Sequence, residues 1–486
     1  MKKVIIVMIL TIALIFSVML IKTFRFTRRH IEIAPSSITE MDLQQAALNL
    51  SHAIQLKTIT DQDAAKIDPA VFKAFHLFLK KTFPKVHDNL YREVINNYSL
   101  LYTWKGTNDN LKPIILMAHM DVVPVDVDTE TEWTYPPFEG RIVDSFIWGR
   151  GSLDDKESLM AIMEAVEILL IEGFNPSRTI YLAFGHDEET GGPKGGAHIA
   201  SFLKSKMVRA EWILDEGGMV ATELMPGLSK PVSLVGIAEK GYLTLELSVR
   251  QEGGHTSMPP PHSAIGVLSS AIHNLERNQF PTKLEGATKL FFEFIGHEMP
   301  FGMRFLFANK WLFSPLIKSK LKKINAMNAM IRTTIALTII EAGSKENVLP
   351  QIARAKVNFR LYPGDSIEYV INHIKKSIND PRVHIKPSNH ASNDASLVSD
   401  VNSDSFTLLQ RTIHQAIPDS IVAPFLMVAG TDTKHYAEIS DNIFRFVPMR
   451  LEFEDLKMIH GKKERLNLNN YQEIIKFYIQ LIRNSN

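Results

Sequence analysis

Cysteine is absent from this chain of 486 residues. Its absence excludes disulfide bonds, thiolate metal ligands and a cysteine nucleophile, and leaves both oxidising and reducing compartments open. An excess of one charge is also missing, because 54 lysines and arginines balance 53 aspartates and glutamates. The chain therefore lacks the basic field that attracts nucleic acid, and we expect no nucleic-acid partner. Its 45% hydrophobic and 22% charged residues are typical of a globular protein of two or three domains.

One segment near the N-terminus contains no charged residue. The apolar run over residues 4–21 reaches the ~18 residues that a membrane-spanning helix needs. It is longer than the apolar core of a typical signal peptide, and no small-residue cleavage pattern follows it. We therefore predict a single-pass transmembrane helix within residues 1–30, with a removed signal sequence as the alternative. Basic residues flank the run on both sides, so the positive-inside rule gives no orientation.

Apolar strands alternate with helices after this anchor. The runs PIILMAHMD, TIYLAFGHD and AEWILDEGG predict buried strands, and ESLMAIMEAVEILLIEG has the apolar spacing of a helix. This order is typical of an α/β fold with a mostly parallel sheet and helices on both faces. Because ligands bind beyond the carboxyl ends of parallel strands, we expect the ionisable residues at the three strand ends to converge. They are His119, Asp121, Glu188, Glu189 and Asp215.

A glycine-rich loop, WGRGSLDDK, adds Asp154 and Asp155 at the start of the predicted helix. Helix capping would explain one of these aspartates. A solvated surface loop would explain the acidic run DEE taken alone. So many carboxylates in one crevice, however, require cations to neutralise them. Histidine and carboxylate ligands without thiolates suit zinc, with manganese or cobalt as alternatives.

Nine motifs follow one another in an order that resembles a known family. They are MAHMDVVP, GRGSLDDK, GHDEETGG, LDEGG, GGHTSMPP, NVLP, VNFR, GTDTKHY and IHGKKE. Together they resemble the dinuclear zinc peptidases and amidohydrolases that include aminoacylase, glutamate carboxypeptidase and carboxypeptidase S. The similarity covers nearly everything after the anchor. It is greatest to the branch of carboxypeptidase S and the N-fatty-acyl-amino-acid synthase/hydrolases.

The resemblance implies two zinc ions per subunit, each with three protein ligands. One ion would be bound by His119, Asp154 and Asp215. The other would be bound by Asp154, Glu189 and His460, so that Asp154 bridges the pair. The Asp154–Asp155 peptide bond would be cis.

The same resemblance implies roles for residues around the ions. Asp121 would orient His119 through the ring nitrogen that does not face a metal. Glu188 would be the general base that takes a proton from the attacking water. His186 and Asp187 match no catalytic position, and we expect them to support the loop.

A second domain is expected to interrupt the first. The segments YLTLELSVR and KVNFRLYPG alternate like half-exposed strands, with helical segments between them. We predict a catalytic domain formed by residues 31–240 and 389–486, with an α+β lid inserted over residues 241–388. By resemblance, this lid would also form a homodimer.

Six further residues match substrate-side positions of the family. His255 would stabilise the oxyanion, with a dimer interface as one route to the site. Arg360 and Asn347 would hold the substrate carboxylate. A substrate-side loop would contain Gly430, Thr431 and Asp432.

These patterns predict a metal-dependent hydrolase of an amide bond to a C-terminal amino acid, with a peptide or an N-acyl amino acid as substrate. A dipeptidase or exopeptidase on short peptides is the alternative. A binding protein with a dead site is less favoured, because every ligand and the base are present. We expect the catalytic body to lie outside the cytoplasm.

The aromatic-rich segment over residues 290–317 has three interpretations. It packs within an enlarged lid, it forms a dimer or membrane-facing surface, or it lines an apolar groove beside the metals. In the last case a long acyl chain would gain about 0.8 kcal/mol for each buried methylene.

Overall fold

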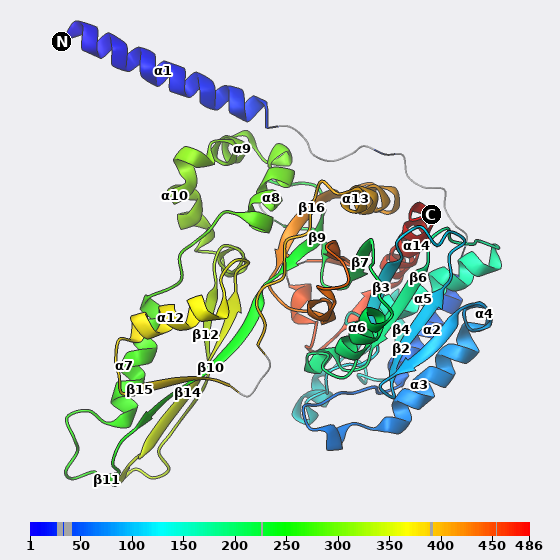
Figure 1. Cartoon of the computed structure of the whole chain (residues 1–486), viewed down its shortest axis with the longest axis horizontal. Helices are drawn as coiled ribbons and strands as arrows, with labels where there is room; N and C mark the ends of the chain where they lie inside the picture. The colour runs from blue at the N-terminus through cyan, green and yellow to red at the C-terminus, as the bar shows by residue number, and fades with distance from the viewer. Residues whose placement is uncertain (27–32, 34–40, 225–226, 389–391, 453) are drawn as a thin grey trace.

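The computed structural model describes residues 1–26, 33, 41–224, 227–388, 392–452 and 454–486. Figure 1 shows a projecting N-terminal helix, a large α/β body and a smaller lid that carries its own sheet. The expected end of the anchor at residue 30 lies outside the described residues.

The body is built on a mixed sheet. Its strands run in the order β1 (Tyr91–Ile95), β2 (Ser99–Trp104), β6 (Ile180–Gly185), β3 (Ile114–His119), β7 (Trp212–Asp215), β17 (Ile443–Arg445), β9 (Val232–Glu239), β8 (Met219–Ala221) and β18 (Arg450–Leu451), and β16 (Ile421–Met427) pairs with β9. A smaller sheet contains β4 (Arg141–Val143), β5 (Phe146–Trp148) and β19 (Arg465–Asn467).

The sheet mixes parallel and antiparallel pairs. Strands β6, β3, β7 and β17 pair in parallel at its centre, and the pairs β16–β9 and β18–β8 are also parallel. The pairs β1–β2, β2–β6, β8–β9 and β9–β17 are antiparallel. The mostly parallel sheet expected from the sequence is therefore a mixed sheet. One physical reason lies between β1 and β2, where Asn96 and Asn97 adopt positive φ angles of 45° and 74°. Asparagine tolerates this conformation, which allows a tight hairpin instead of a helical crossover.

Helices cover both faces of the body sheet. Alternate side chains of β3 enter different cores on the two faces, because Leu116 belongs to one hydrophobic core and Met117 to another. The helices of the body are α2 (Leu43–Gln55), α3 (Pro69–Thr82), α4 (Pro84–Asn89), α5 (Lys156–Ile171), α6 (Gly196–Ser205), α13 (Asp404–Ala416) and α14 (Leu468–Asn484). Burial on both faces explains why the central strands are continuous apolar runs.

The lid begins at Gly241, the first residue of β10. Its sheet has the order β12 (Thr334–Ala342), β14 (Ile352–Leu361), β10 (Gly241–Arg250) and β15 (Val383–Pro387), with antiparallel pairing throughout. Helices α7 (Ala264–Arg277) and α12 (Ile367–Ile378) pack against one face of it. A two-stranded ribbon, β11 (Gly254–His255) with β13 (Val348–Leu349), lies at the far end of the lid in Figure 1.

The helical segment inside the predicted lid packs with the body instead. It contains α8 (Gly286–Ile295), α9 (Phe301–Ala308), α10 (Lys310–Leu321) and α11 (Asn325–Ala329). Phe291, Phe294 and Ile317 share the hydrophobic core of the large sheet, and α8 contacts β16. The continuous lid expected over residues 241–388 is therefore interrupted, because the apolar faces of these helices are buried against the body.

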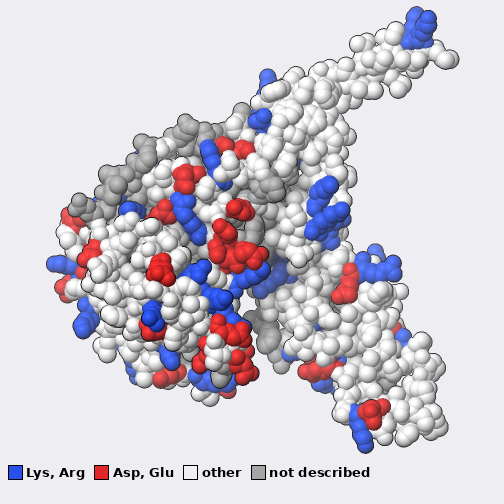
Figure 2. All heavy atoms as spheres, turned by 180° about the vertical axis from the view of Figure 1, so that it is seen from behind, with Lys and Arg blue, Asp and Glu red and all other residues white. Residues whose placement is uncertain are grey.

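The N-terminal helix α1 (Lys2–Phe24) stands out from the body, and nearly all of it is exposed. It is long and apolar enough to cross a membrane, although a signal sequence near an N-terminus passes the same test. Figure 2 shows that this arm carries basic side chains only at its tip and near its base.

Candidate metal centre

Two groups of potential metal ligands meet at Asp154, just before α5. The first group contains His119, Asp154 and Glu216, and the second contains Asp154, Glu189 and His460. His119 Nε2 lies 3.0 Å from Asp154 Oδ1 and 3.5 Å from Glu216 Oε1. His460 Nε2 lies 3.0 Å from both Asp154 Oδ2 and Glu189 Oε2. Each oxygen of Asp154 therefore faces a different group, which is the arrangement of a bridging carboxylate.

The first group contains Glu216 in the place predicted for Asp215. Asp215 is the last residue of β7 and is buried, its carboxyl group lies near Thr431, and its Oδ2 has no hydrogen-bond partner among the described residues. Burial raises the pKa of Asp215 to about 6. Successive side chains of a strand point in opposite directions, so only one of two adjacent carboxylates can face the cluster. The motif LDEGG contains both candidates, and its spacing does not distinguish them.

The donor set fits divalent metal ions. Each group offers one imidazole nitrogen and two carboxylates, a combination typical of zinc sites that keep a position open for water or substrate. Glu189 Oε1 is buried and has no hydrogen-bond partner among the described residues. Hydrogen bonds to Asp154 and Glu189 raise the pKa of His460 to about 10. The carboxylates around it would stabilise a bound cation in the same way.

Asp121 contacts both the candidate ligand His119 and the loop that carries Glu188. The Nδ1 atom of His119 lies 3.0 Å from the backbone oxygen of Asp121 and 3.3 Å from its Oδ1, so that Nε2 is directed to the ligand group. The Asp121 carboxylate also accepts hydrogen bonds from the backbone N–H groups of Glu188 and Glu189, both at 3.2 Å. One aspartate thus fixes both a ligand histidine and the loop that carries Glu188.

Glu188 lies beside the second group, on a short 3₁₀ turn formed by Glu188–Thr190. It is partly buried, and its side chain belongs to neither ligand group. Burial raises the pKa of Glu188 well above its usual value, and the nearby Glu216 and Asp432 raise it further. A carboxylate with a raised pKa next to ligand positions has the properties of a general base.

The neighbouring residues His186 and Asp187 hold this loop, as expected. His186 Nδ1 lies 2.6 Å from the hydroxyl of Ser99. Asp187 accepts hydrogen bonds from the backbone N–H groups of Lys194 and Gly195 at 2.8 and 2.7 Å. Both residues therefore act on the loop conformation.

A buried ion pair that the motif analysis missed joins two ligand-bearing loops. Arg150 pairs with Glu464, and the Nη2 atom of Arg150 donates to the backbone oxygen of His460 at 3.2 Å. Glu464 also accepts from the backbone N–H groups of Gly151 and Leu153, both at 2.9 Å. The available signal was an unassigned charge of opposite sign in the two motifs, Arg150 in GRGSLDDK and Glu464 in IHGKKE.

The predicted substrate-side residues differ in how far they are buried. Arg360 is partly buried over the Tyr242 ring at 4.9 Å, and one of its nitrogens lies 3.9 Å from where a Cβ of Gly430 would be. Thr431 and Asp432 are buried and have only 2% and 4% of their surface exposed, so neither presents its side chain to a substrate.

The buried loop residues have partners inside the protein. Thr431 donates to Glu239 at 2.7 Å. Asp432 packs against Gly185, Gly192 and Gly196 of the adjoining loop. Burial raises the pKa of Asp432 to about 8, with a further contribution from the Asp215 carboxylate.

His255 and Asn347 are exposed on the lid. His255 lies in the two-stranded ribbon at the far end of the lid in Figure 1, and Asn347 directly precedes β13 of the same ribbon. Neither belongs to a ligand group of this subunit. The Asp154–Asp155 peptide bond is cis, as the resemblance implied.

A family model described as peptidase family M20/M25/M40 matches residues 115–484. The chain belongs to peptidase family M20/M25/M40. It is therefore a metal-dependent hydrolase of peptide or N-acyl amide bonds. The matched range includes every residue of the two ligand groups, because these residues lie between His119 and His460.

Individual M20 relatives agree with this assignment. Probable carboxypeptidase S-like 2 of Dictyostelium discoideum is 47% identical over 97% of this chain and 92% of its own length. N-fatty-acyl-amino acid synthase/hydrolase PM20D1 of Homo sapiens is 36% identical over 93% of this chain and 90% of its own. The crystal structure of the M20 family metallo-carboxypeptidase Sso-CP2 from Sulfolobus solfataricus has the same fold, with a TM-score of 0.64, 18% identity and coverage of 92% and 99%.

Proposed function

We propose that this M20 enzyme hydrolyses the amide bond between an acyl or peptidyl group and a C-terminal amino acid, using two zinc ions. The observation that carries this proposal is the shared carboxylate of Asp154, with its two oxygens facing the two ligand groups. His119 and Glu216 complete one group, and Glu189 and His460 complete the other. Bound ions would supply Lewis acidity, which polarises the amide carbonyl and acidifies water.

Glu188 moves the proton in this proposal. Its carboxylate takes a proton from the attacking water while the new C–O bond forms, and it passes that proton to the amine nitrogen as the C–N bond breaks. The raised pKa of Glu188 suits this cycle, because the carboxyl group can hold the proton between the two transfers.

Arg360 recognises the substrate carboxylate in this proposal. Its guanidinium reaches from lid strand β14 to the loop at Gly430, so the lid and the body both contribute to the subsite. An arginine can bind a carboxylate with two parallel hydrogen bonds, which fixes the position of a C-terminal amino acid.

His255 and Asn347 act on the active site of a second subunit in this proposal. Both are exposed at the end of the lid and outside the ligand groups of their own subunit. A homodimer formed through the lid would bring His255 to the partner's reacting carbonyl, where an imidazole can stabilise the oxyanion.

Helix α1 anchors the enzyme to a membrane, and the catalytic body lies outside the cytoplasm in this proposal. The length, apolar composition and exposure of α1 support the anchor. Fusing reporters after residue 40 tests the orientation. A reporter that is active only in the cytoplasm would reverse the assignment.

A substrate panel tests the function directly. The purified enzyme, with its metal content measured, is assayed on N-acyl amino acids from acetyl to oleoyl, on dipeptides, and on the same compounds with an amidated C-terminus. We expect metal-dependent cleavage, strong loss of activity on the amidated compounds, and a preference for acyl substrates. Efficient cleavage of dipeptides without a preference for acyl chains would assign the enzyme to the dipeptidases instead.

A further inference from the structure

Helices α9 and α10 present large apolar side chains to solvent. Phe301, Trp311, Leu312 and Leu316 have between 47% and 56% of their surface exposed. We call these four residues the apolar surface. The opposite faces of the same helices are buried, as Phe307 and Ile317 join the core of the body. The exposed side chains are therefore not a by-product of loose packing.

This apolar surface is fixed to the base of α1. Met19 and Thr23 are the buried residues of α1, and both contact Asn309, whose side-chain amide lies 3.2 Å from Met19 O and from Thr23 Oγ1. The rings of Phe24 and Phe301 are 6.1 Å apart, and Lys22 Nζ lies 5.5 Å from the Trp311 ring centre. If α1 crosses a membrane, these contacts place the apolar surface at the level where the helix leaves it.

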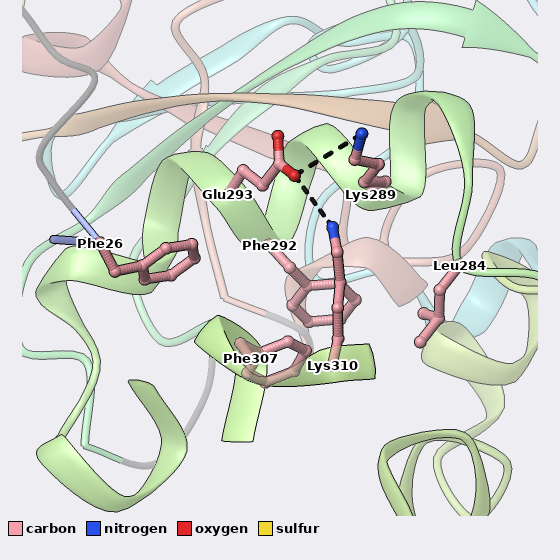
Figure 3. A pocket seen from close by; sticks show the side chains of 7 residues that line it. All are labelled: Phe26, Leu284, Lys289, Phe292, Glu293, Phe307 and Lys310. Atoms are coloured by element: carbon pink, nitrogen blue, oxygen red, sulfur yellow. Dashed lines mark hydrogen bonds and ion pairs between the residues drawn. The ribbon is translucent and has the colours of Figure 1, made fainter. Parts of the chain in front are cut away.

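The region beneath the apolar surface is well packed. Figure 3 shows Lys289 and Lys310 pointing toward Glu293, with Nζ to carboxylate distances of 3.8 and 2.9 Å. The rings of Phe292 and Phe307 stack at 4.3 Å. The pocket that these side chains line has a volume of ≈ 10 Å³, which is about the space of one water molecule. It cannot admit an acyl chain.

This packing does not support the predicted acyl groove. Phe26 closes the same pocket from the α1 side, and none of the residues that line it is a ligand of the candidate metal centre. The aromatic segment contacts α1 and the body core instead.

The segment that contains α9 and α10 carries only positive charges. Residues 299–340 contain no aspartate or glutamate, but they include lysines and arginines throughout. Lys320, Lys322 and Lys323 are exposed at the end of α10. Figure 2 shows basic side chains gathered below the base of the arm. An apolar surface flanked by lysines is complementary to the acyl and phosphate layers of a phospholipid surface.

We propose that α9 and α10 lie on the membrane at the base of α1, with the apolar surface in the lipid interface and Lys320, Lys322 and Lys323 on headgroup phosphates. This placement rests on α1 as the proposed anchor. It would give the catalytic body a fixed orientation relative to the bilayer instead of a free tether.

The absence of cysteine allows a direct test with single labels on the full chain. Leu312→Cys carries a polarity-sensitive fluorophore on the apolar surface, and Leu10→Cys carries it on α1. Leu77→Cys is the matched control, because Leu77 is a leucine with 69% of its surface exposed on α3. Each variant is reconstituted in vesicles of equal parts phosphatidylcholine and phosphatidylserine, and quenching by spin-labelled lipids is measured.

We expect strong quenching at positions 10 and 312 and none at position 77. Quenching at 10 without quenching at 312 would overturn the docked surface while leaving the anchor intact. Absence of quenching at both would overturn the docking and the anchor together. The label at position 312 could also report an apolar environment in detergent and show no further change in vesicles. That result would indicate a protein–protein contact and would also overturn the proposal.

Charge reversal tests the role of the lysines. The triple variant Lys320→Glu, Lys322→Glu and Lys323→Glu should lose most of the quenching at position 312 and keep that at position 10. Lys375→Glu with Lys376→Glu is the control, because these lysines are also exposed and lie on α12 of the lid. Equal quenching at 312 in the triple variant would overturn the contact with headgroup phosphates.

Trp311 provides a label-free check of the same surface. The other four tryptophans, Trp104, Trp133, Trp148 and Trp212, are at most 9% exposed, so lipid quenchers should act on Trp311 alone. Brominated lipids should therefore lower the fluorescence of the wild-type chain and not that of Trp311→Phe. Equal quenching of both proteins would contradict the proposal.

Discussion

Adjacent acidic residues divide their roles around the candidate metal centre. Three such pairs approach it, and in each pair only one member belongs to a ligand group: Asp154–Asp155, Glu188–Glu189 and Asp215–Glu216. Of the other members, Asp155 accepts a hydrogen bond from the backbone N–H of His119 at 3.1 Å. Glu188 acts on the reacting water in our proposal, and Asp215 is buried in the protein interior. Neighbouring side chains that point in different directions let a short segment provide both a ligand and a second carboxylate with a different pKa.

Glu188→Gln tests the proposed base. The amide keeps the size of the side chain but cannot accept the proton, so we expect turnover to fall by about 100- to 10,000-fold. Metal content should be unchanged, because Glu188 is not in a ligand group. Metal analysis and kcat on the same sample check both points. Turnover near that of the wild type at full metal loading would remove Glu188 from this role.

Glu216→Gln and Asp215→Asn test which carboxylate binds metal. Glu216 lies 3.5 Å from His119 Nε2, whereas Asp215 is turned toward Thr431. Glu216→Gln should therefore lose about one metal ion per subunit, on the order of a 10- to 100-fold loss of affinity at that group. Asp215→Asn should retain both ions. The reverse pattern, measured by metal analysis after dialysis, would restore the prediction made from the sequence.

At the scale of elements, the loop between β6 and α6 depends on close packing by Asp432. Gly192 has a φ of +68°, and a Cβ there would lie 1.8 Å from Asp432 Oδ1. Gly173, at the end of α5, has a similar φ of +76° but no atom within 4 Å of the corresponding Cβ position. Substitution of Gly173 therefore tests backbone strain alone, whereas substitution of Gly192 tests backbone strain together with steric overlap.

Gly192→Ala should destabilise the enzyme and displace the loop that carries Glu188 and Glu189. Gly173→Ala should show only the cost of the left-handed backbone, about 1–2 kcal/mol. We expect a lower midpoint of thermal unfolding for both, and a loss of metal and activity for Gly192→Ala alone. Equal behaviour of the two variants would mean that Asp432 yields to the added methyl group.

At the scale of the whole molecule, metal binding is coupled to protons. Hydrogen bonds from Asp154 and Glu189 raise the pKa of His460 to about 10, and burial raises that of Glu216 well above its usual value. His460 therefore holds a proton near neutral pH in the metal-free protein and must release it to bind metal. Affinity for zinc should rise with pH across the neutral range and level off only near pH 10, where His460 loses its proton without metal. Competition with a zinc indicator measures it, and a flat profile would contradict this coupling.

The proposed dimer predicts complementation between two inactive variants. In a heterodimer of Glu188→Gln and His255→Ala, the subunit with intact Glu188 faces the partner that retains His255. One site of that dimer is complete. Randomly assorted dimers should then regain about a quarter of wild-type activity after mixing and refolding. Mixtures that remain as inactive as either variant alone would place His255 outside the partner's site.

The sequence by itself determined the family and predicted most residues of the candidate metal centre. The candidate ligands His119, Asp154, Glu189 and His460 lie within motifs that resemble those of the family, and the structure brings all four together. The contact between Asp121 and His119 was likewise implied by the family resemblance. Each of these residues lies within a short motif, so the sequence alone is enough to identify it.

Only the tertiary structure decided the remaining questions, because each depends on direction or on contacts between distant segments. The choice between Asp215 and Glu216 depends on which way a side chain leaves β7. The hydrogen bonds of Glu464 join two loops that are more than 300 residues apart in the sequence. The aromatic segment, which the sequence places in the lid, contacts the body and α1. Burial of an apolar face needs only a complementary surface, and the sequence does not specify whether the lid, the body or a membrane provides it.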